Sequence, residues 1–416
     1  MLALTALLLM NSQNLLVTQV RTETRERIEN GRSSIARVED RALELEVAPV
    51  VRYDYIGKRG DDHMVLLYTP RFILPNVGDA ISGDFSDRRS RFSPYHNAGF
   101  GLELQRPGYK FMLYGFGAYG SITTSALLYQ KPWNGEGFPV VPMALLPAER
   151  AARFTLIFYQ PQVATTFRLA PHWSLTPMVK YNAFGGADGV SRATIPLTAG
   201  PQAQLVLEAK PTRRDTFRTL LGVSYTEITA AQLDVTGTFQ FDRPAAPVTA
   251  AFGEQRYSRD LARDVIGEVA IGANAFSSLT AGARLAPTGE VNIQYRGVSK
   301  KIVVRAKQEP WLNIFGQEFE PRTELTAAGY FDLSQHWVYR AQATGARTLG
   351  KLDSVSRYTL LLGDTGIQYK ITRAASVDGG VRFGFQDLTN ANIDSRVTQL
   401  ILYAGFTYAP PLPTRL

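Results

Sequence analysis

The chain has 416 residues, a net charge of +8 at pH 7 and an ordinary hydrophobic content of 45%. It lacks the run of about eighteen apolar residues that a membrane-spanning helix needs, which excludes a helical membrane protein. Cysteine is absent, which excludes disulfides, thiolate metal sites and cysteine nucleophiles, and the basic residues are dispersed among acidic ones, which argues against a nucleic-acid surface.

The amino-terminal segments differ from the rest of the chain. Residues 1–14 begin with MLALTALLLM, an apolar stretch typical of the core of a secretory signal, although no basic region precedes it and no cleavage site follows closely. A short buried segment is the alternative. Residues 15–40 carry charges of both signs and no aromatic residue. This composition predicts a polar helix or a disordered lead-in.

From residue 43 onward, apolar and polar side chains alternate with a period of two. The blocks 43–55 (LELEVAPVVRYDY) and 374–387 (AASVDGGVRFGFQD) each have one apolar and one polar face. Successive side chains of a strand point to opposite sides, so each block predicts a strand. Pro49 lies on the apolar face and suggests a bulge or an edge-like position. A soluble sandwich alternates too, but so many long blocks rich in tyrosine and phenylalanine favour a closed barrel in lipid.

These blocks continue to residue 409. Because bacterial single-chain barrels have even strand numbers, we expect an all-β, transmembrane, antiparallel up-and-down β-barrel of roughly 16–18 strands over 41–409, with 18 favoured. Residues 410–416 form a C-terminal tail. The predicted strands are 43–55, 63–73, 97–106, 109–120, 152–169, 172–184, 201–210, 216–229, 263–276, 279–286, 290–297, 300–308, 323–333, 336–348, 356–371, 374–387 and 396–409, with 232–242 as a weaker candidate.

The connections between these blocks fall into two classes of length. Outer-membrane barrels place short turns on the periplasmic side and long loops outside, so we expect the two classes at opposite ends. A long loop could also fold into the lumen as a constriction. The tight connections are 106–109, 169–173, 276–279, 332–336 and 371–375, and the long ones are 74–96, 121–151, 185–200 and 230–262.

Aromatic residues recur where the strands enter and leave their turns. The turn 167–175 (FRLAPHWSL) is similar to 331–339 (FDLSQHWVY), and each has a tryptophan at the start of the next strand. Tryptophan and tyrosine settle at the depth of the lipid headgroups. These hairpins, and the last strand 397–408 (VTQLILYAGFTY), resemble Gram-negative outer-membrane β-barrel proteins of the porin type. The candidate interface aromatics are Trp173, Trp337, Tyr339, Tyr369, Phe385 and Tyr408.

The resemblance implies an integral protein of the cell outer membrane, with 15–40 on the periplasmic side. It implies outer-membrane lipids, lipopolysaccharide and the barrel-assembly machinery as partners, and neither a cofactor nor a nucleic acid. Porin-like barrels of this size also resemble the barrels that accompany polysaccharide-export machines, which would add a periplasmic export component. The tail 410–416 departs from the terminal aromatic residue that is usual in this class.

Charged residues on the polar face are the candidates for a functional role. Rings of such groups tune the selectivity of a pore through local potential and hydrogen bonding. The alternative is hydration of a wide lumen, or cross-strand pairing that stiffens the wall. By register the lumen-facing set comprises Glu44, Glu46, Arg52, Asp54, Glu103, Lys180, Glu208, Arg218, Glu268, Arg296, Arg305, Lys307, Glu324, Arg340, Asp378 and Arg382.

One arrangement could carry catalysis. His172 and Ser174 share a strand face, and outer-membrane lipases and lipid A deacylases use a His-x-Ser pairing in which the imidazole activates the hydroxyl. Those enzymes present the pair to lipid, whereas the alternation places His172 and Ser174 on the lumen side. The matching turn at 336–338 lacks the serine. We therefore predict no enzyme, and the four histidines have no spacing that predicts a metal site.

The favoured function is a pore for hydrophilic solutes. A dedicated barrel for polysaccharide export is the alternative, and it would be expected to line its path with aromatic residues, of which the alternation places few on the lumen side. A structural or adhesin barrel with a closed lumen and an outer-membrane lipid hydrolase are the further alternatives.

Overall fold

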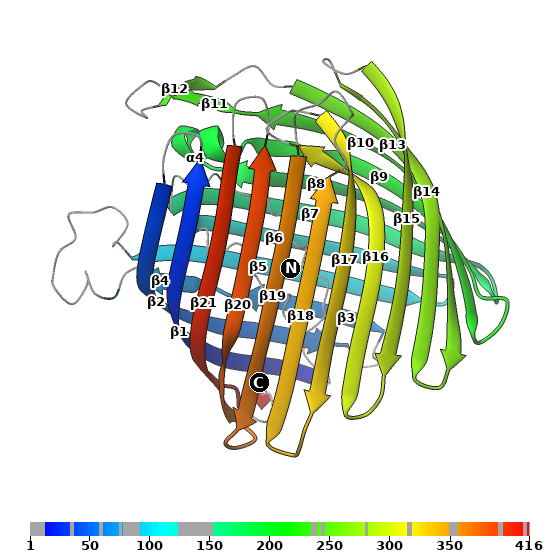
Figure 1. Cartoon of the computed structure of the whole chain (residues 1–416). Coiled ribbons are helices and arrows are strands. Elements are labelled where there is room, and N and C mark those ends of the chain that lie inside the picture. The colour runs from blue at the N-terminus through cyan, green and yellow to red at the C-terminus, as the bar shows by residue number, and fades with distance from the viewer. Residues whose placement is uncertain are drawn as a thin grey trace, which may run out of the picture.

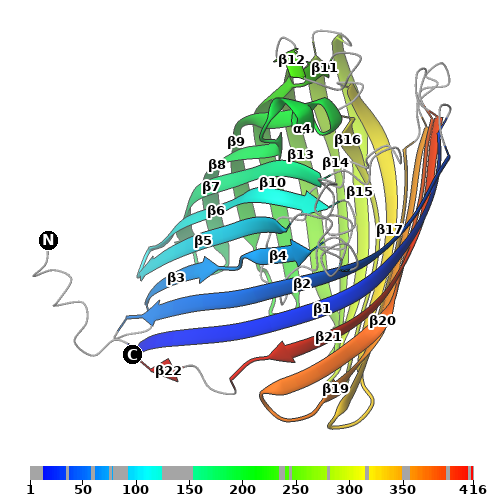
Figure 2. The ribbon, with the colours of Figure 1, turned by 90° about the vertical axis from the view of Figure 1, so that its left-hand side faces the viewer.

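The alternating strands close into one barrel. The computed structural model describes residues 13–33, 37–57, 61–74, 77, 92–123, 153–233, 239–242, 246–278, 282–313, 318–348, 357–389, 394–410 and 414–415. Within these ranges, twenty strands form one sheet, and β1 (Gln13–Ser33) pairs with β21 (Asp394–Tyr408) to close it (Figures 1 and 2). β3 and β4 are two halves of one strand between β2 and β5, and β22 pairs only with the start of β1. The barrel therefore has 18 strands.

The strands run up and down in chain order, each antiparallel to the next. Their bounds are β2 (Arg37–Ile56), β3 (Asp62–Tyr68), β4 (Arg71–Leu74), β5 (Ser93–Arg106), β6 (Tyr109–Thr123), β7 (Arg153–Ala170), β8 (Trp173–Gly186), β9 (Leu197–Ala209), β10 (Asp215–Thr229), β13 (Ala246–Ala262), β14 (Val265–Ser278), β15 (Gly282–Arg296), β16 (Lys300–Asn313), β17 (Glu318–Asp332), β18 (Trp337–Thr348), β19 (Arg357–Lys370), β20 (Ala375–Thr389) and β22 (Thr414–Arg415).

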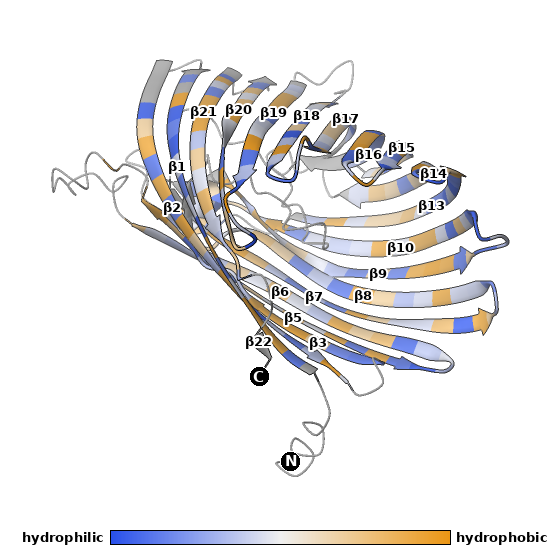
Figure 3. Cartoon of the chain, turned by 90° about the horizontal axis from the view of Figure 1, so that it is seen from below, coloured by the Kyte–Doolittle hydropathy of each residue, from blue (hydrophilic) through white to orange (hydrophobic). Residues whose placement is uncertain are grey.

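One face of the sheet is polar and concave, and the other is apolar and convex. Arg382 on β20 contacts Glu23 on β1 across the intervening β21, and side chains two strands apart converge in this way only on the concave side of a curved sheet. Large apolar side chains such as Val304, Val381 and Leu402 are exposed on the other face. The alternation of hydrophilic and hydrophobic residues along each strand is visible from below in Figure 3.

The connections differ between the two ends of the barrel, as predicted. Short turns join β5 to β6, β7 to β8, β15 to β16, β17 to β18 and β19 to β20 at one end. The opposite end carries α4 (Gly189–Thr194) and a separate small sheet of β11 (Ala231–Leu233) and β12 (Phe239–Asp242) (Figure 1). The tight connection predicted at 276–279 joins β14 to β15 at this second end, so its expected placement is wrong. Among the described residues, no helix is long and apolar enough to cross a membrane.

The barrel begins earlier than the sequence predicts. Residues 15–40, expected as a polar helix or a disordered lead-in, contribute β1 and the start of β2, so the predicted domain boundary at 41 is wrong. The physical reason is that β1 is polar on both faces and shows no apolar period. Residues 1–12 of the predicted signal-like segment lie outside the described residues. In the predicted tail, Thr414 and Arg415 pair with the start of β1.

Three other strand predictions are wrong, although the expected number of 18 agrees with the structure. The segment 246–262, expected within a long loop, is β13. The two strands predicted at 279–286 and 290–297 are one strand, β15, with Pro287 inside it. Pro287 lies where β15 pairs with β14 alone, because its ladder with β16 starts at Gly289, and proline is tolerated at such a position. The weak candidate 232–242 contributes to β11 and β12, outside the barrel.

Pro49 shows the same tolerance on β2. Its strand continues without a bulge, because Pro49 pairs with Val20 in an unbroken register with β1. On the other side of β2, the ladders with β3 and β4 leave a gap between Val47 and Val51. The break that Pro49 suggests is therefore in the neighbouring strand.

Candidate functional site

The inner wall holds every charged residue of the predicted lumen-facing set. Residues that pair directly across two neighbouring strands point to the same side of the sheet. Followed from strand to strand around the barrel, this pairing places every member of the set on the same side as the buried Glu44. They do not form a uniform ring. We distinguish a closure belt on β4, β2, β1 and β18 to β21, a charged sector on β13 to β17, and an amide sector on β6 to β9.

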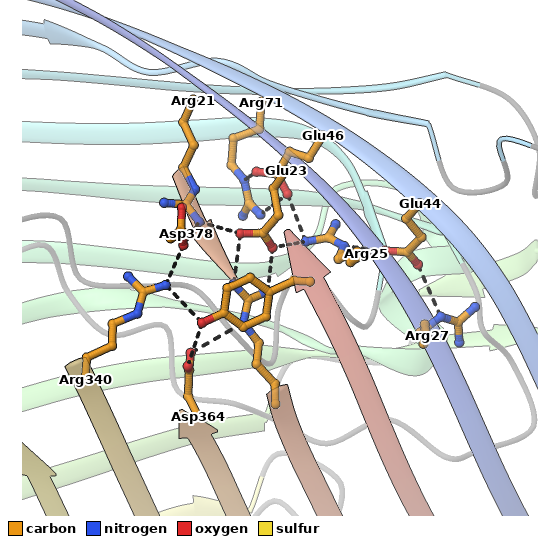
Figure 4. A network of polar contacts seen from close by, with 12 residues as sticks. Arg21, Glu23, Arg25, Arg27, Glu44, Glu46, Arg71, Arg340, Asp364 and Asp378 are labelled. Carbon is orange, nitrogen blue, oxygen red and sulfur yellow. Dashed lines mark hydrogen bonds and ion pairs between the residues drawn. The ribbon is translucent and has the colours of Figure 1, made fainter. Parts of the chain in front are cut away.

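The closure belt comprises Arg21, Glu23, Arg25, Arg27, Glu44, Glu46, Arg71, Arg340, Asp364, Asp378, Arg382 and Tyr403 (Figure 4). Arg25 is central on β1: its Nε donates to Glu44 at 2.6 Å, and its Nη1 lies 3.0 Å from Glu46. Arg27 donates to the second oxygen of Glu44 at 3.2 Å. Arg71 on β4 makes a two-point contact with Glu46 at 2.6 and 2.9 Å. These contacts tie β4, β2 and β1 together.

The other half of the belt crosses the seam where the first and last strands meet. Arg382 on β20 donates to both oxygens of Glu23, at 2.6 and 2.9 Å. Arg21 on β1 donates to Glu23 at 2.7 Å and to Asp378 on β20 at 3.0 Å. Arg340 on β18 donates to the same oxygen of Asp378 at 2.7 Å. The seam is therefore crossed by ion pairs in addition to the backbone ladder.

Tyr403 on β21 completes the belt. Its hydroxyl accepts a hydrogen bond from Arg340 at 3.0 Å, and the guanidinium of Arg382 lies 4.0 Å from the centre of its ring. Asp364 is 3.4 Å from Arg382. Glu44 is 0% and Arg382 is 2% exposed. Buried charges that pair in this way hold neighbouring strands together, so the belt stiffens the wall and leaves few of its groups for a solute to contact.

The charged sector is more accessible. Arg256 on β13 contacts Glu254 at 2.9 Å, Glu290 at 3.2 Å and also Glu268, so one cation faces three carboxylates. All three carboxylates lie within this sector on β13, β14 and β15. The three carboxylates outnumber the one cation, and of the three Glu254 and Glu268 are partly exposed while Glu290 is buried.

Basic side chains follow on the next two strands. Glu324 on β17 accepts hydrogen bonds from Arg305 on β16 and Arg322 on β17, both at 3.0 Å. Lys307 on β16 pairs with Glu309. The side chain of Arg305 is 38% exposed. Arg305 and Lys307 therefore remain candidates for a role in ion selectivity.

The remaining predicted charges also have neighbours, with one exception. The pairs are Arg52 with Asp54 at 2.9 Å, Lys110 with Glu103 at 2.6 Å, Arg218 with Glu208 at 2.7 Å, and Arg296 with the amide of Gln294 at 3.1 Å. Lys180 makes no ion pair within the described part of the chain. This pairing favours the wall-stiffening alternative for most of the set, and a role in selectivity stays a prediction.

The predicted lumen-facing set omits seven of the twelve closure-belt residues, among them Asp364 and Tyr403. Arg21, Glu23, Arg25 and Arg27 lie in the segment that was predicted to be outside the barrel, and Arg71 lies on β4. A signal was present, because charges of opposite sign recur on every second residue from Arg21 to Arg25. A period of two places such charges on one face of a strand, which a polar helix would not need.

The amide sector comprises Tyr114, Phe116, Gln160, Gln162, Lys180, Asn182, Gln202 and Gln204, all on the inner face and half-buried. Phe158 and Phe184 also face inward from β7 and β8. The prediction that few aromatic residues lie on this face is therefore wrong. The strand assignment was correct here, but the alternation in 152–184 is weak, since apolar residues occupy both faces.

The predicted interface aromatics all lie on the outer face. Trp173, Trp337 and Tyr408 lie at the ends of strands next to the short turns, and the rings of Trp337 and Tyr369 are 4.7 Å apart. Tyr339 is two residues further along β18. Phe385 lies toward the opposite end of β20. This placement suits side chains that meet the headgroup region, although their contact with lipid remains a prediction.

The candidate catalytic pair is not assembled. Ser174 faces inward opposite Glu208, and His172 lies in the turn before it with an exposed side chain. No hydrogen bond joins their side chains in the described structure. The described residues also contain no group of three or more histidine, aspartate or glutamate side chains placed to hold a metal ion.

Solved structures of similar shape include outer-membrane proteins of Pseudomonas aeruginosa. OpdQ is 11% identical with a TM-score of 0.44, and the match covers 95% of this chain and 98% of that one. OpdK, solved with vanillate, is 12% identical with a TM-score of 0.46, covering 94% and 99%. OccK2 (OpdF), solved in complex with glucuronate, is 10% identical with a TM-score of 0.45, covering 94% and 98%.

A search of the curated proteins found no match. The sequence model of the EpsX exopolysaccharide export family matches residues 12–241. This range is more than half of the 416 residues and runs from the start of β1 through β10 to β12. It includes the amide sector and the part of the closure belt on β1, β2 and β4. The chain therefore belongs to the EpsX exopolysaccharide export family.

Proposed function

We propose that this barrel is the outer-membrane conduit through which an exopolysaccharide leaves the cell. The observation that carries the proposal is the combination of an export-family match with a closed barrel whose inner wall carries the charged and amide side chains described above. A hydrated polymer needs a continuous path lined by hydrogen-bonding groups across the hydrocarbon layer. The apolar outer face and the outward aromatics near the strand ends support residence in the outer membrane, with the short turns facing the periplasm.

Two features of the wall support passage of a polymer. The seam is stabilised by buried ion pairs, which would keep the barrel closed while a bulky chain moves through it. The amide sector offers half-buried groups that suit sugar hydroxyls. A periplasmic export component at the short-turn end would deliver the polymer. The barrel-assembly machinery, lipopolysaccharide and the surrounding lipids remain the other proposed partners.

The direct test is deletion of the gene in the native host. We expect the cells to lose surface and secreted polysaccharide while the polymer, or its lipid-linked precursor, accumulates inside the outer membrane. Expression of the unaltered chain should restore export. Normal export in the deletion strain would contradict the proposal. The control for general membrane defects is the level of other outer-membrane proteins in the deletion strain, which should stay normal.

A pore for small hydrophilic solutes is the second candidate function. The partly exposed charges of the charged sector, such as Arg305 and Glu254, favour it, since they resemble groups that tune ion passage. Single-channel recording in a planar bilayer separates the two. A large current that oligosaccharides leave unchanged supports a diffusion pore, whereas a current that oligosaccharides block supports a dedicated export conduit.

A further inference from the structure

The inner wall is chemically asymmetric. The closure belt and the charged sector present ionised groups on β13 to β21, β1, β2 and β4. On β6 to β9, between Tyr114 and Gln204, the inward positions at mid-height are amides, aromatic rings, methionines and a single ionised group, Lys180. The barrel therefore has one stretch of wall that is hydrogen-bonding but almost free of charge.

The amides of this sector form two neighbouring rows. In the first row, Tyr114, Gln162, Lys180 and Gln202 are paired directly across β6, β7, β8 and β9. In the second row, Gln160 donates to Asn182 at 2.7 Å. The side chains of Gln162 and Lys180 have no side-chain partner within the described residues. This half-buried surface therefore keeps donors and acceptors that the wall itself does not engage.

Sugars present two kinds of surface that such a wall matches. Their hydroxyl groups both donate and accept, and a side-chain amide offers two donors and an acceptor with two lone pairs. The C–H faces of a pyranose ring are apolar and pack against aromatic rings. Phe116 lies next to Gln160 in the second row, and its ring centre is 5.4 Å from that of Phe158. The same patch can therefore contact both surfaces of a sugar unit.

We propose that the amide sector is the surface on which the exported polysaccharide slides, and that Lys180 contacts an acidic substituent of that polymer. This inference rests on the proposed export function. The belt's ionised groups are buried and engaged with one another, so they offer a polymer little, while each amide contact is weak and replaceable, which lets a chain bind and still move. The substrate class is a polymer of mainly uncharged pyranose units that carries sparse carboxylate groups.

The test is block of single-channel current by short oligosaccharides. Two probes of equal length are added to the reconstituted barrel: maltoheptaose, which is neutral, and heptagalacturonate, which is acidic. The sector variants are Gln162→Ala with Gln204→Ala, two amides that no side chain of the described wall engages, and Lys180→Met. The matched control is Gln342→Ala, because Gln342 faces inward from β18, on the opposite wall. Stable channels of each variant, recorded before sugar is added, show that it is folded and inserted.

We expect the double amide variant to raise the half-blocking concentration of both probes about fivefold to tenfold, as loss of one or two hydrogen bonds predicts. Lys180→Met should weaken block by the galacturonate several-fold and leave block by maltoheptaose unchanged. Gln342→Ala should change neither. If the sugars block the unaltered barrel but the sector variants have the same half-blocking concentrations as Gln342→Ala, the amide sector is not the sliding surface, and the proposed export function is unaffected. If neither sugar blocks the unaltered barrel, both ideas are overturned.

Discussion

Replacing Arg382 with methionine removes one of the ion pairs that cross the seam while keeping most of the side chain's volume. Arg382 makes two charge-assisted hydrogen bonds to Glu23, at 2.6 and 2.9 Å, and is 2% exposed. Such bonds contribute about 1.5–3 kcal/mol each. Removing one partner of a buried pair costs about 3–5 kcal/mol, because the other charge stays buried. Glu23 keeps Arg21 at 2.7 Å, so we expect the lower end, about 3 kcal/mol of unfolding free energy.

The measurement is reversible denaturant unfolding of the barrel in lipid vesicles, followed by tryptophan fluorescence. The double variant Arg382→Met with Glu23→Gln should lose clearly less unfolding free energy than the sum of the two single variants. In the double variant both charges of the pair are absent, so neither is left buried without its partner. Arg41→Met is the control, because Arg41 pairs with Glu26 but its side chain is 75% exposed; it should cost less than about 1 kcal/mol. A loss below about 1 kcal/mol for Arg382→Met, or strict additivity with Glu23→Gln, would refute the view that the belt holds the seam.

The other predictions concern the outer face, the charged sector and the long-loop end. Val381→Arg places a charge on the outer face and should cost about 2–4 kcal/mol in lipid, whereas an effect near zero would mean that this face is not in hydrocarbon. Arg305→Glu with Lys307→Glu should shift the reversal potential toward cations in a conducting barrel; an unchanged potential would place both charges off the ion path. Arg192→Ala removes the contacts at 2.9 and 3.1 Å by which α4 holds Asp242 of β12, so trypsin should cut this end faster at unchanged barrel stability.

The barrel architecture could be predicted from the sequence because most of its strands have lipid on one side and a polar interior on the other. A strand between lipid and a polar interior must alternate, and β20 with Val381 and Phe383 outside and Arg382 inside shows this directly. The two strands that were missed lack that contrast. In β1, the outward Thr22 and Thr24 are nearly as polar as the inward residues.

In β13 the outward row contains Thr249, Ala251, Gly253 and Gln255, which have little apolar bulk. The alternation alone predicts which side of its strand each charged residue faces. It does not predict which residue each charge pairs with, because Arg340 contacts Asp378 two strands away and Arg21 contacts Asp378 from the other end of the chain. Such contacts depend on curvature and closure, which no local pattern records.

The alternating charges along β1 also act as a check on assembly. Arg21, Glu23 and Arg25 follow one another on the inner face, and Arg382 contacts the middle one. A slip of the closing strands by one residue would exchange inside and outside, and a slip by two would bring a cation of β1 against Arg382. Only the native register joins opposite charges. If the barrel forms one strand after another, the pairing of β1 with β21 comes last and joins the two barrel strands that are most distant in the sequence. The alternating charges of β1 then disfavour the registers closest to the native one.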